Sequence, residues 1–177
     1  MKHLLKLTFL CLFLSTITHS QNIEKLDEKN GFKDFKLGDS FYKWENELTL
    51  QGTKNNVKTY KYNGTCCNTV YEYPLESILL DFADNKLVII SLLHKSVPES
   101  GSYSKLDISK IYSKLIDSFG VFSTKDTSNS SKVFMYWFGK KVDLLYVWTY
   151  LGASVGQNYE IFIYDKAFLD KKTSDGF

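Results

Sequence analysis

Two strand-like runs separated by a tight turn dominate the middle of the sequence. In Glu76–Phe82, large apolar residues fall on every second position, as in a strand with one buried face. Lys86–Leu93 is apolar on both sides, as in a strand at the centre of a sheet. The intervening Ala83-Asp-Asn-Lys86 favours a tight turn. The sequence therefore predicts a β-hairpin here, and with it an antiparallel sheet.

Four further segments are rich in the β-branched and aromatic residues that favour strands. They are Val57–Tyr62, Lys132–Phe138, Val142–Leu151 and Tyr159–Asp165. Gly139-Lys140-Lys141 predicts a turn that joins the second and third of these segments into a hairpin. The loops predicted between the remaining elements are Val97–Ser104, Thr124–Ser131 and Gly152–Asn158.

Two segments have the spacing of an amphipathic helix. The first starts at Asp39 or Ser40 and ends before Gly52, and its apolar residues Phe41, Trp44 and Leu48 recur at intervals of three and four. The second starts after Asp107 and ends at Gly120. Its apolar face comprises Ile108, Ile111, Tyr112, Leu115, Ile116 and Phe119.

Each predicted helix precedes three predicted strands. A shift of 67 residues places Phe41 on Ile108, Trp44 on Ile111 and Leu48 on Leu115, which suggests a helix-β-β-β repeat. One helix in each half is enough to cover one face of a sheet. The predicted fold class is therefore α+β, a two-layer domain in which two helices pack on an antiparallel sheet.

The element order and two short motifs resemble a known fold. Phe35-Lys-Leu-Gly-Asp39 leads into the first predicted helix, and Asp84-Asn-Lys-Leu87 turns into a strand. These features are similar to the β-lactamase-inhibitor-protein-like fold, which small outer-membrane-assembly lipoproteins share. The chain from about Gly31 to Asp165 also resembles uncharacterised secreted proteins of Bacteroidetes. The resemblance implies a protein-binding module and supplies no site residues; the cysteine of the lipoproteins is missing here.

The amino terminus reads as a secretory signal peptide over residues 1–20. Lys2 and Lys6 precede the apolar stretch Leu7–Ile17, and Thr18-His19-Ser20 places small residues before a cut ahead of Gln21. The eleven residues of that stretch would rise only about 16 Å as a helix, against about 30 Å of hydrocarbon, so no stable membrane span is predicted. The predicted organisation is a flexible lead-in at 21–30, one domain at 31–166, a polar tail at 167–177, and a secreted or periplasmic location.

Removal of the signal peptide leaves a neutral chain. Of the 22 basic residues, all lysine, Lys2 and Lys6 are lost, and the remaining 20 equal the 20 acidic residues in number. Without arginine or a basic excess, nucleic-acid binding is not expected. The processed chain keeps a single histidine, His94, and contains no C-x-x-C or H-E-x-x-H, so neither a metal nor a cofactor is predicted.

The residues that could support catalysis are few. His94 ends a predicted strand, where it is either a structural residue or a general base. Two carboxylates could also face each other across a site, as in a hydrolase. The candidates in or beside strands are Asp81, Asp84, Asp143, Glu160 and Asp165.

Cys66 and Cys67 are adjacent and have no other cysteine to pair with after processing. Their Cα atoms lie about 3.8 Å apart, below the usual range of about 4.4–6.8 Å for a disulfide. Three states stay open: two reduced or partly buried thiols, a strained vicinal disulfide, or sulfurs that engage another chain or a metal. The flanking Asn63-Gly-Thr65 and Asn68-Thr69 predict a loop, which would permit the strained ring.

Aromatic residues make up 16% of the chain and concentrate on the predicted strands near its carboxyl end. Tyr146, Trp148 and Tyr150 share one face of a strand, and Trp137 lies on the neighbouring strand. They form either a packed core or an exposed platform for binding. The opposite strand face is not clearly polar either; it carries Asp143, Leu145, Val147 and Thr149.

These observations together predict an exported, non-enzymatic binding module. It would engage an envelope or extracellular protein through a sheet face or a loop, with Trp137, Tyr146, Trp148 and Tyr150 as candidate contact residues. The alternative is an envelope hydrolase that uses carboxylates or His94.

Overall fold

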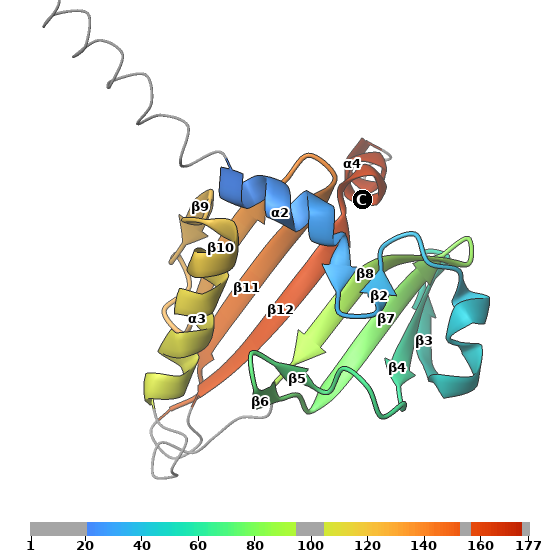
Figure 1. Cartoon of the computed structure of the whole chain (residues 1–177), viewed down its shortest axis with the longest axis horizontal. Helices are drawn as coiled ribbons and strands as arrows, with labels where there is room; N and C mark the ends of the chain where they lie inside the picture. Colours follow the sequence, from blue (N-terminus) through green and yellow to red (C-terminus); the bar gives the residue numbers. More distant parts are fainter. Residues whose placement is uncertain (1–20, 95–104, 153–156, 175–177) are drawn as a thin grey trace, which may run out of the picture.

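An eight-stranded antiparallel sheet forms the centre of the computed structural model, which describes residues 21–94, 105–152 and 157–174 (Figure 1). The strand order is β3-β4-β7-β8-β12-β11-β10-β9. The first half of the chain supplies four contiguous strands, β3-β4-β7-β8, and the second half supplies the other four, β12-β11-β10-β9. The two sets join where β8 pairs with β12. The strands are β3 (Leu48–Lys54), β4 (Val57–Tyr62), β7 (Ser77–Ala83), β8 (Lys86–Leu93), β9 (Thr124–Asp126), β10 (Lys132–Phe138), β11 (Val142–Tyr150) and β12 (Gln157–Asp165).

Three α-helices and two small hairpins accompany the sheet in the described residues. In Figure 1, the hairpins lie over the half of the sheet that contains β4, β7 and β8, and the helices α2 and α3 lie over the half that contains β10, β11 and β12. The bounds are α2 (Gln21–Lys29), α3 (Lys105–Phe119), α4 (Lys166–Ser174), β1 (Gly31–Phe32), β2 (Phe35–Lys36), β5 (Thr69–Val70) and β6 (Tyr73–Pro74). No helix within the described ranges has the length and apolar character needed to cross a bilayer.

The α+β class and the antiparallel sheet are confirmed. The strands β4, β8 and β10 have the predicted bounds, and β7 pairs with β8 across the predicted turn. The helix α3 begins two residues before Asp107 and ends at Phe119. The predicted loop at Thr124–Ser131 contains the short strand β9. The predicted signal peptide, the loop at Val97–Ser104 and most of the loop at Gly152–Asn158 lie outside the described residues.

The helix predicted from Asp39 is wrong. Two single 3-10 turns, Phe41–Lys43 and Glu45–Glu47, occupy its first part, and β3 begins at Leu48. A spacing of three brings Phe41 and Trp44 to one side of a 3-10 segment as well as of a helix. Their rings pack on strand residues, because Phe41 lies 5.5 Å from Phe82 and Trp44 lies 4.7 Å from Phe35, measured between ring centroids.

Gly52 therefore does not end a helix. It lies inside β3, where the register with β4 shifts between Leu50 and Gly52 in a β-bulge. Glycine is common at such irregular strand positions because its backbone is permissive.

The predicted flexible lead-in is the helix α2. Leu26 is 1% exposed, and α2 packs against α3 and β11. The carboxylate of Asp27 accepts hydrogen bonds from the backbone N–H groups of Lys140, Lys141 and Val142 at 2.8–3.0 Å. These contacts join the helix to the turn between β10 and β11, a partner that lies too far along the chain for local sequence patterns to reveal.

Part of the predicted polar tail is also helical. Asp165 Oδ1 accepts a hydrogen bond from the Phe168 backbone N–H at 3.2 Å, which satisfies one of the free donors at the start of α4. The ammonium of Lys166 lies 3.5 Å from Asp143 Oδ2 of β11. The α4 helix is therefore attached to one end of the sheet.

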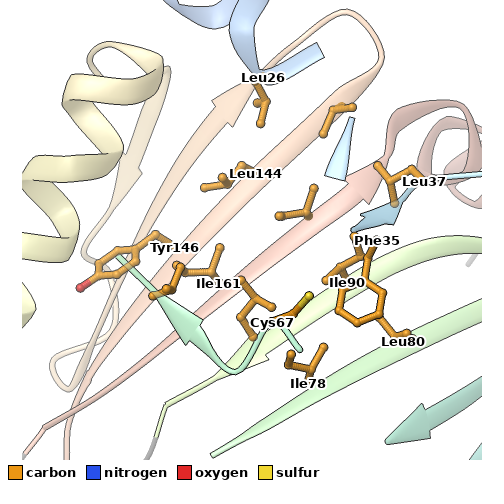
Figure 2. Packing of buried hydrophobic residues seen from close by; sticks show 14 of the residues in the cluster. Leu26, Phe35, Leu37, Cys67, Ile78, Leu80, Ile90, Leu144, Tyr146 and Ile161 are labelled. Carbon is orange, nitrogen blue, oxygen red and sulfur yellow. The ribbon is translucent and has the colours of Figure 1, made fainter. Parts of the chain in front are cut away.

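The hydrophobic core lies between the sheet and the elements α2, α3, β1–β2 and β5–β6. Alternation along each strand places Leu144 and Tyr146 of β11, together with Ile161 of β12, on the face that Leu26 covers (Figure 2). We call this side of the sheet the covered face. Its largest fully buried side chains include Trp137, Tyr146, Tyr159, Phe35, Ile90 and Ile161.

Candidate functional site

The four aromatic residues singled out in the sequence all belong to the covered face, but they differ in burial. Trp137 is 0% exposed and Tyr146 is 1% exposed, so neither can contact a partner in this structure. The Trp137 indole N–H donates to the Gly120 carbonyl at 2.8 Å, which seals the end of α3 against β10. Tyr146 lies with its ring centroid 6.4 Å from Tyr112 of α3 and 6.1 Å from Tyr159 of β12. Of the two alternatives left open by the sequence, the packed core applies to these two residues, because Tyr112 of α3 covers Tyr146 and the segment after α3, with Gly120 and Phe122, covers Trp137.

The other two aromatic residues lie toward the end of β11. Trp148 is half-buried, and its indole N–H donates to Gln157 Oε1 at 2.9 Å. Tyr150, in the last position of the strand, is 39% exposed. The four residues thus run from the core to its border and do not form one surface.

The opposite side of the sheet, which we call the open face, carries a second set of apolar and aromatic side chains. The helices α2 and α3 lie on the other side of the sheet (Figure 1). The strand register aligns open-face residues in three rows. These rows are Phe134-Val147-Glu160-Leu93, Tyr136-Leu145-Phe162-Ser91-Leu79 and Phe138-Asp143-Tyr164-Ile89-Asp81.

Most open-face side chains are half-buried by one another. Tyr136 stacks on Phe138 with centroids 5.7 Å apart, and Phe162 stacks on Tyr164 at 6.1 Å. Phe138, at the border of the face, is 48% exposed. The signal for this surface was present in the sequence as alternating aromatic residues in Lys132–Phe138 and Tyr159–Asp165. Periodicity alone could not show that these alternate positions would lack a covering helix.

The candidate catalytic carboxylates are not brought together as a pair. Asp81 and Asp143 lie in the same open-face row, but Ile89 and Tyr164 stand between them. Three inter-strand spacings amount to about 14 Å, whereas paired carboxylates of glycoside hydrolases lie about 5–9.5 Å apart. Burial raises the pKa of both carboxyl groups, and the Lys166 ammonium opposes that effect at Asp143.

The remaining catalytic candidates have separate positions. Asp165 caps α4, and Asp84 is exposed in the turn between β7 and β8. Glu160 lies on β12 in the interior of the open face, between Val147 and Leu93 of the neighbouring strands. The His94 imidazole stacks on the Tyr159 ring with centroids 4.3 Å apart.

Cys66 and Cys67 place their sulfur atoms 2.7 Å apart. Adjacent side chains of an extended strand point to opposite sides, but Cys67 has a φ of +69°, which turns the backbone and brings the two side chains together. Cys66 Sγ also shares a hydrogen bond of 3.0 Å with the Tyr62 hydroxyl. Burial and the neighbouring Cys66 raise the pKa of the Cys67 thiol to about 11.

One group of potential metal ligands occurs among the described residues. Asp34 and the two cysteines place a carboxylate oxygen and both sulfurs within 4.8 Å of one another. Two sulfurs and one oxygen are donors that suit a thiophilic ion such as Zn²⁺. The pair was singled out in the sequence, but Asp34 was not, because it approaches Cys67 across 33 residues of chain.

Comparison with protein-family models, curated proteins and solved structures gave no match for this chain.

Proposed function

We propose that this chain is an exported, non-enzymatic binding module that engages a protein partner through the open face. The observation that carries this proposal is a sheet face rich in aromatic and aliphatic residues that neither α2 nor α3 covers. Apolar patches of this kind mark interaction sites, and aromatic residues supply much of the binding energy in protein interfaces. Export is supported by Lys2, Lys6 and the apolar stretch Leu7–Ile17.

The finer architecture that fits this proposal has two layers. The helices α2 and α3 and the hairpins form one layer, and the sheet forms the other. The α4 helix lies at one end of the open face, where Lys166 approaches Asp143, and the rest of that face is proposed as the surface for a partner. Each half of the chain then consists of a helix, α2 or α3, that precedes a set of antiparallel strands. The half-chains are proposed as structural repeats in this sense, with α2 in place of the helix predicted from Asp39.

Glu160 indicates the chemistry of the partner. Its carboxylate lies among apolar neighbours, and no lysine of the described residues forms an ion pair with it. A partner with an apolar patch and a basic residue would complement this arrangement. A second copy of the chain would instead bring a further unpaired carboxylate to the same surface. We therefore infer a different protein as the partner.

Site-specific photocrosslinking in the native envelope tests the proposal. A photoreactive phenylalanine analogue at Phe162 should crosslink to a partner, whereas the same analogue at Tyr42 should not. Tyr42 is a suitable control because it is 65% exposed and lies outside the open face. Substitution Glu160→Lys should abolish the crosslink from position 162, because the basic residue of the partner would meet a like charge.

The matched control for charge is Glu45→Lys, which makes the same change at an exposed position outside the sheet. A crosslinked product with twice the mass of the chain would show that a second copy occupies the face and would contradict the proposal. An unchanged crosslink in Glu160→Lys would equally exclude the assigned role of Glu160.

A further inference from the structure

The covered face contains a cavity of about 400 Å³ between the helices and the hairpins. Its floor consists of aliphatic side chains from three adjacent strands of the sheet: Leu92, Leu144, Ile161 and Ile163. Leu26 of α2, Leu115 of α3 and Val70 of β5 form walls. The volume lies at the lower end of the range of about 300–1,000 Å³ for pockets that hold small ligands.

The lining is unusual for a gap in a core because lysines stand at its border. Lys29, Lys33 and Lys36 all line the cavity and are exposed. Within the described part of the chain, none of the three forms an ion pair with a carboxylate. The cavity thus combines an aliphatic interior with three ammonium groups that form no ion pair within the described residues.

The three lysines are held in place by contacts with other parts of the border. The Lys29 ammonium lies 4.9 Å from the centroid of the Phe119 ring, and Lys36 Nζ donates to the Lys29 carbonyl at 2.9 Å. Lys33 Nζ donates to Thr69 Oγ1 at 3.0 Å, which joins the turn after β1 to β5. The ammonium groups are therefore directed along the border of the cavity by defined partners.

We propose that this cavity binds an anionic amphiphile with one aliphatic chain. The chain would lie on the floor of Leu144 and Ile161, where it would supply van der Waals contacts that an empty apolar cavity lacks. The carboxylate or phosphate head would remain at the border and pair with Lys33 and Lys36. The volume favours a chain of medium length.

The backbone conformation at the border of the cavity restricts which residues can replace Gly31. Gly31 has a φ of +144°, and a Cβ at this position would collide with the Phe35 carbonyl oxygen. On the opposite side, the Tyr71 hydroxyl shares a hydrogen bond of 2.9 Å with Ser118 Oγ of α3. This contact ties the β5–β6 hairpin to the helix across the cavity.

The cavity lies on the covered face and is separate from the open face, so ligand binding there does not depend on the proposed protein partner.

Isothermal titration of the processed protein with dodecanoate and with dodecanol, both below the concentration of micelle formation, tests the proposal. Dodecanoate should bind with a stoichiometry of one and about tenfold more tightly than the neutral dodecanol, because charge-assisted contacts favour the anion. The double variant Lys33→Gln/Lys36→Gln should lose this preference and bind both compounds alike. Lys58→Gln, an exposed lysine of β4, is the matched control and should behave as wild type.

A cavity-filling substitution tests the position of the chain. Leu144→Phe should abolish binding of both compounds, since the larger ring would occupy the floor. Tighter binding of dodecyl phosphate than of dodecanoate would identify a phosphate head, and the reverse order would identify a fatty acid; either order supports the proposal. No binding of either anion, or equal binding of dodecanoate by wild type and by the lysine double variant, would overturn it. The lysine variant changes only exposed side chains, so the test does not depend on how well Leu144→Phe folds.

Discussion

The two faces of the eight-stranded sheet are both rich in aromatic and aliphatic side chains, yet α2 and α3 cover only one of them. On the covered face, Trp137 and Tyr146 lie under α3 and are sealed from solvent. On the open face, their neighbours Tyr136 and Leu145 are half-buried by the side chains beside them. The difference shows that the same residue types build a core or a surface depending on which face of the sheet α2 and α3 cover.

The largest expected effect is a difference in unfolding free energy between substitutions at Trp137 and Tyr136, adjacent residues of β10 that lie on opposite faces of the sheet. Trp137→Ala should lower the free energy of unfolding by about 3–5 kcal/mol, because it leaves a cavity in the core and removes the hydrogen bond to Gly120. Tyr136→Ala should cost about 1 kcal/mol, since the ring is only half-buried. Urea denaturation of the two variants measures both values. Equal losses would mean that the open face is as tightly packed as the covered face.

A smaller effect concerns the attachment of the helix that covers part of the core. Asp27→Asn should destabilise the protein by about 1–2 kcal/mol, because a neutral amide accepts hydrogen bonds from the β10–β11 turn less strongly than a carboxylate. Burial alone would raise the pKa of Asp27, but the backbone hydrogen bonds from Lys141, Lys140 and Val142 outweigh it and lower the pKa.

The sign of the pH dependence follows from that lowered pKa. The unfolded chain binds a proton at Asp27 more readily than the folded chain does, so the stabilisation is present at neutral pH and is lost as the pH falls below the ordinary value of 3.8. The difference in unfolding free energy between wild type and Asp27→Asn should therefore shrink below pH 4. If the difference in unfolding free energy stayed constant down to pH 2, the negative charge of Asp27 would not be what attaches α2 to the β10–β11 turn.

The smallest effect concerns the buried sulfur beside the covered face. Because burial and the neighbouring Cys66 raise the pKa of Cys67, its thiolate fraction at pH 8 is lower than that of a cysteine with the ordinary pKa of 9.0. Alkylation of Cys67 in reduced protein should accelerate as the pH rises from 8 toward 11. Since the raised pKa favours the protonated folded state, the thiol also stabilises the fold below pH 9 and loses that contribution as the pH rises toward 11.

The oxidation state of the Cys66–Cys67 pair can be tested directly in the non-reduced protein. The separation of 2.7 Å between the sulfurs compares with about 2.05 Å in a disulfide. Mass spectrometry of the non-reduced protein should show the loss of two hydrogens between Cys66 and Cys67 if the vicinal bridge forms. Recovery of two freely alkylated thiols would exclude the bridge.

The elements that could be predicted from the sequence are those whose residues specify their own structure. The α3 helix has a continuous apolar stripe, and β8 is apolar on both sides, so local periodicity was sufficient for each. The segment from Phe41 was misread because intervals of three and four also fit 3-10 turns whose rings pack on Phe35 and Phe82. The α2 helix was missed because its position depends on Asp27 and a turn more than 110 residues away.

The candidate sites were less predictable for the same physical reason. Aromatic positions on β11 were recognised, but which of its two faces is covered depends on where α3 packs. The floor of the cavity is formed by strands from both halves of the chain, and its walls are formed by α2, α3 and β5. Because these residues are far apart in the sequence, no local pattern predicts the cavity. The lysines at its border look like an ordinary solvated surface in the sequence.

The two outer strands of the sheet have a further consequence for how the molecule associates. The β9 strand is only three residues long, with every residue exposed, and the bulge between Leu50 and Gly52 interrupts β3. Short, charged or bulged margins are poor templates for the addition of another strand, so they guard a sheet against edge-to-edge polymerisation. The margins of this sheet therefore protect its apolar strands against the edge-to-edge addition of further strands.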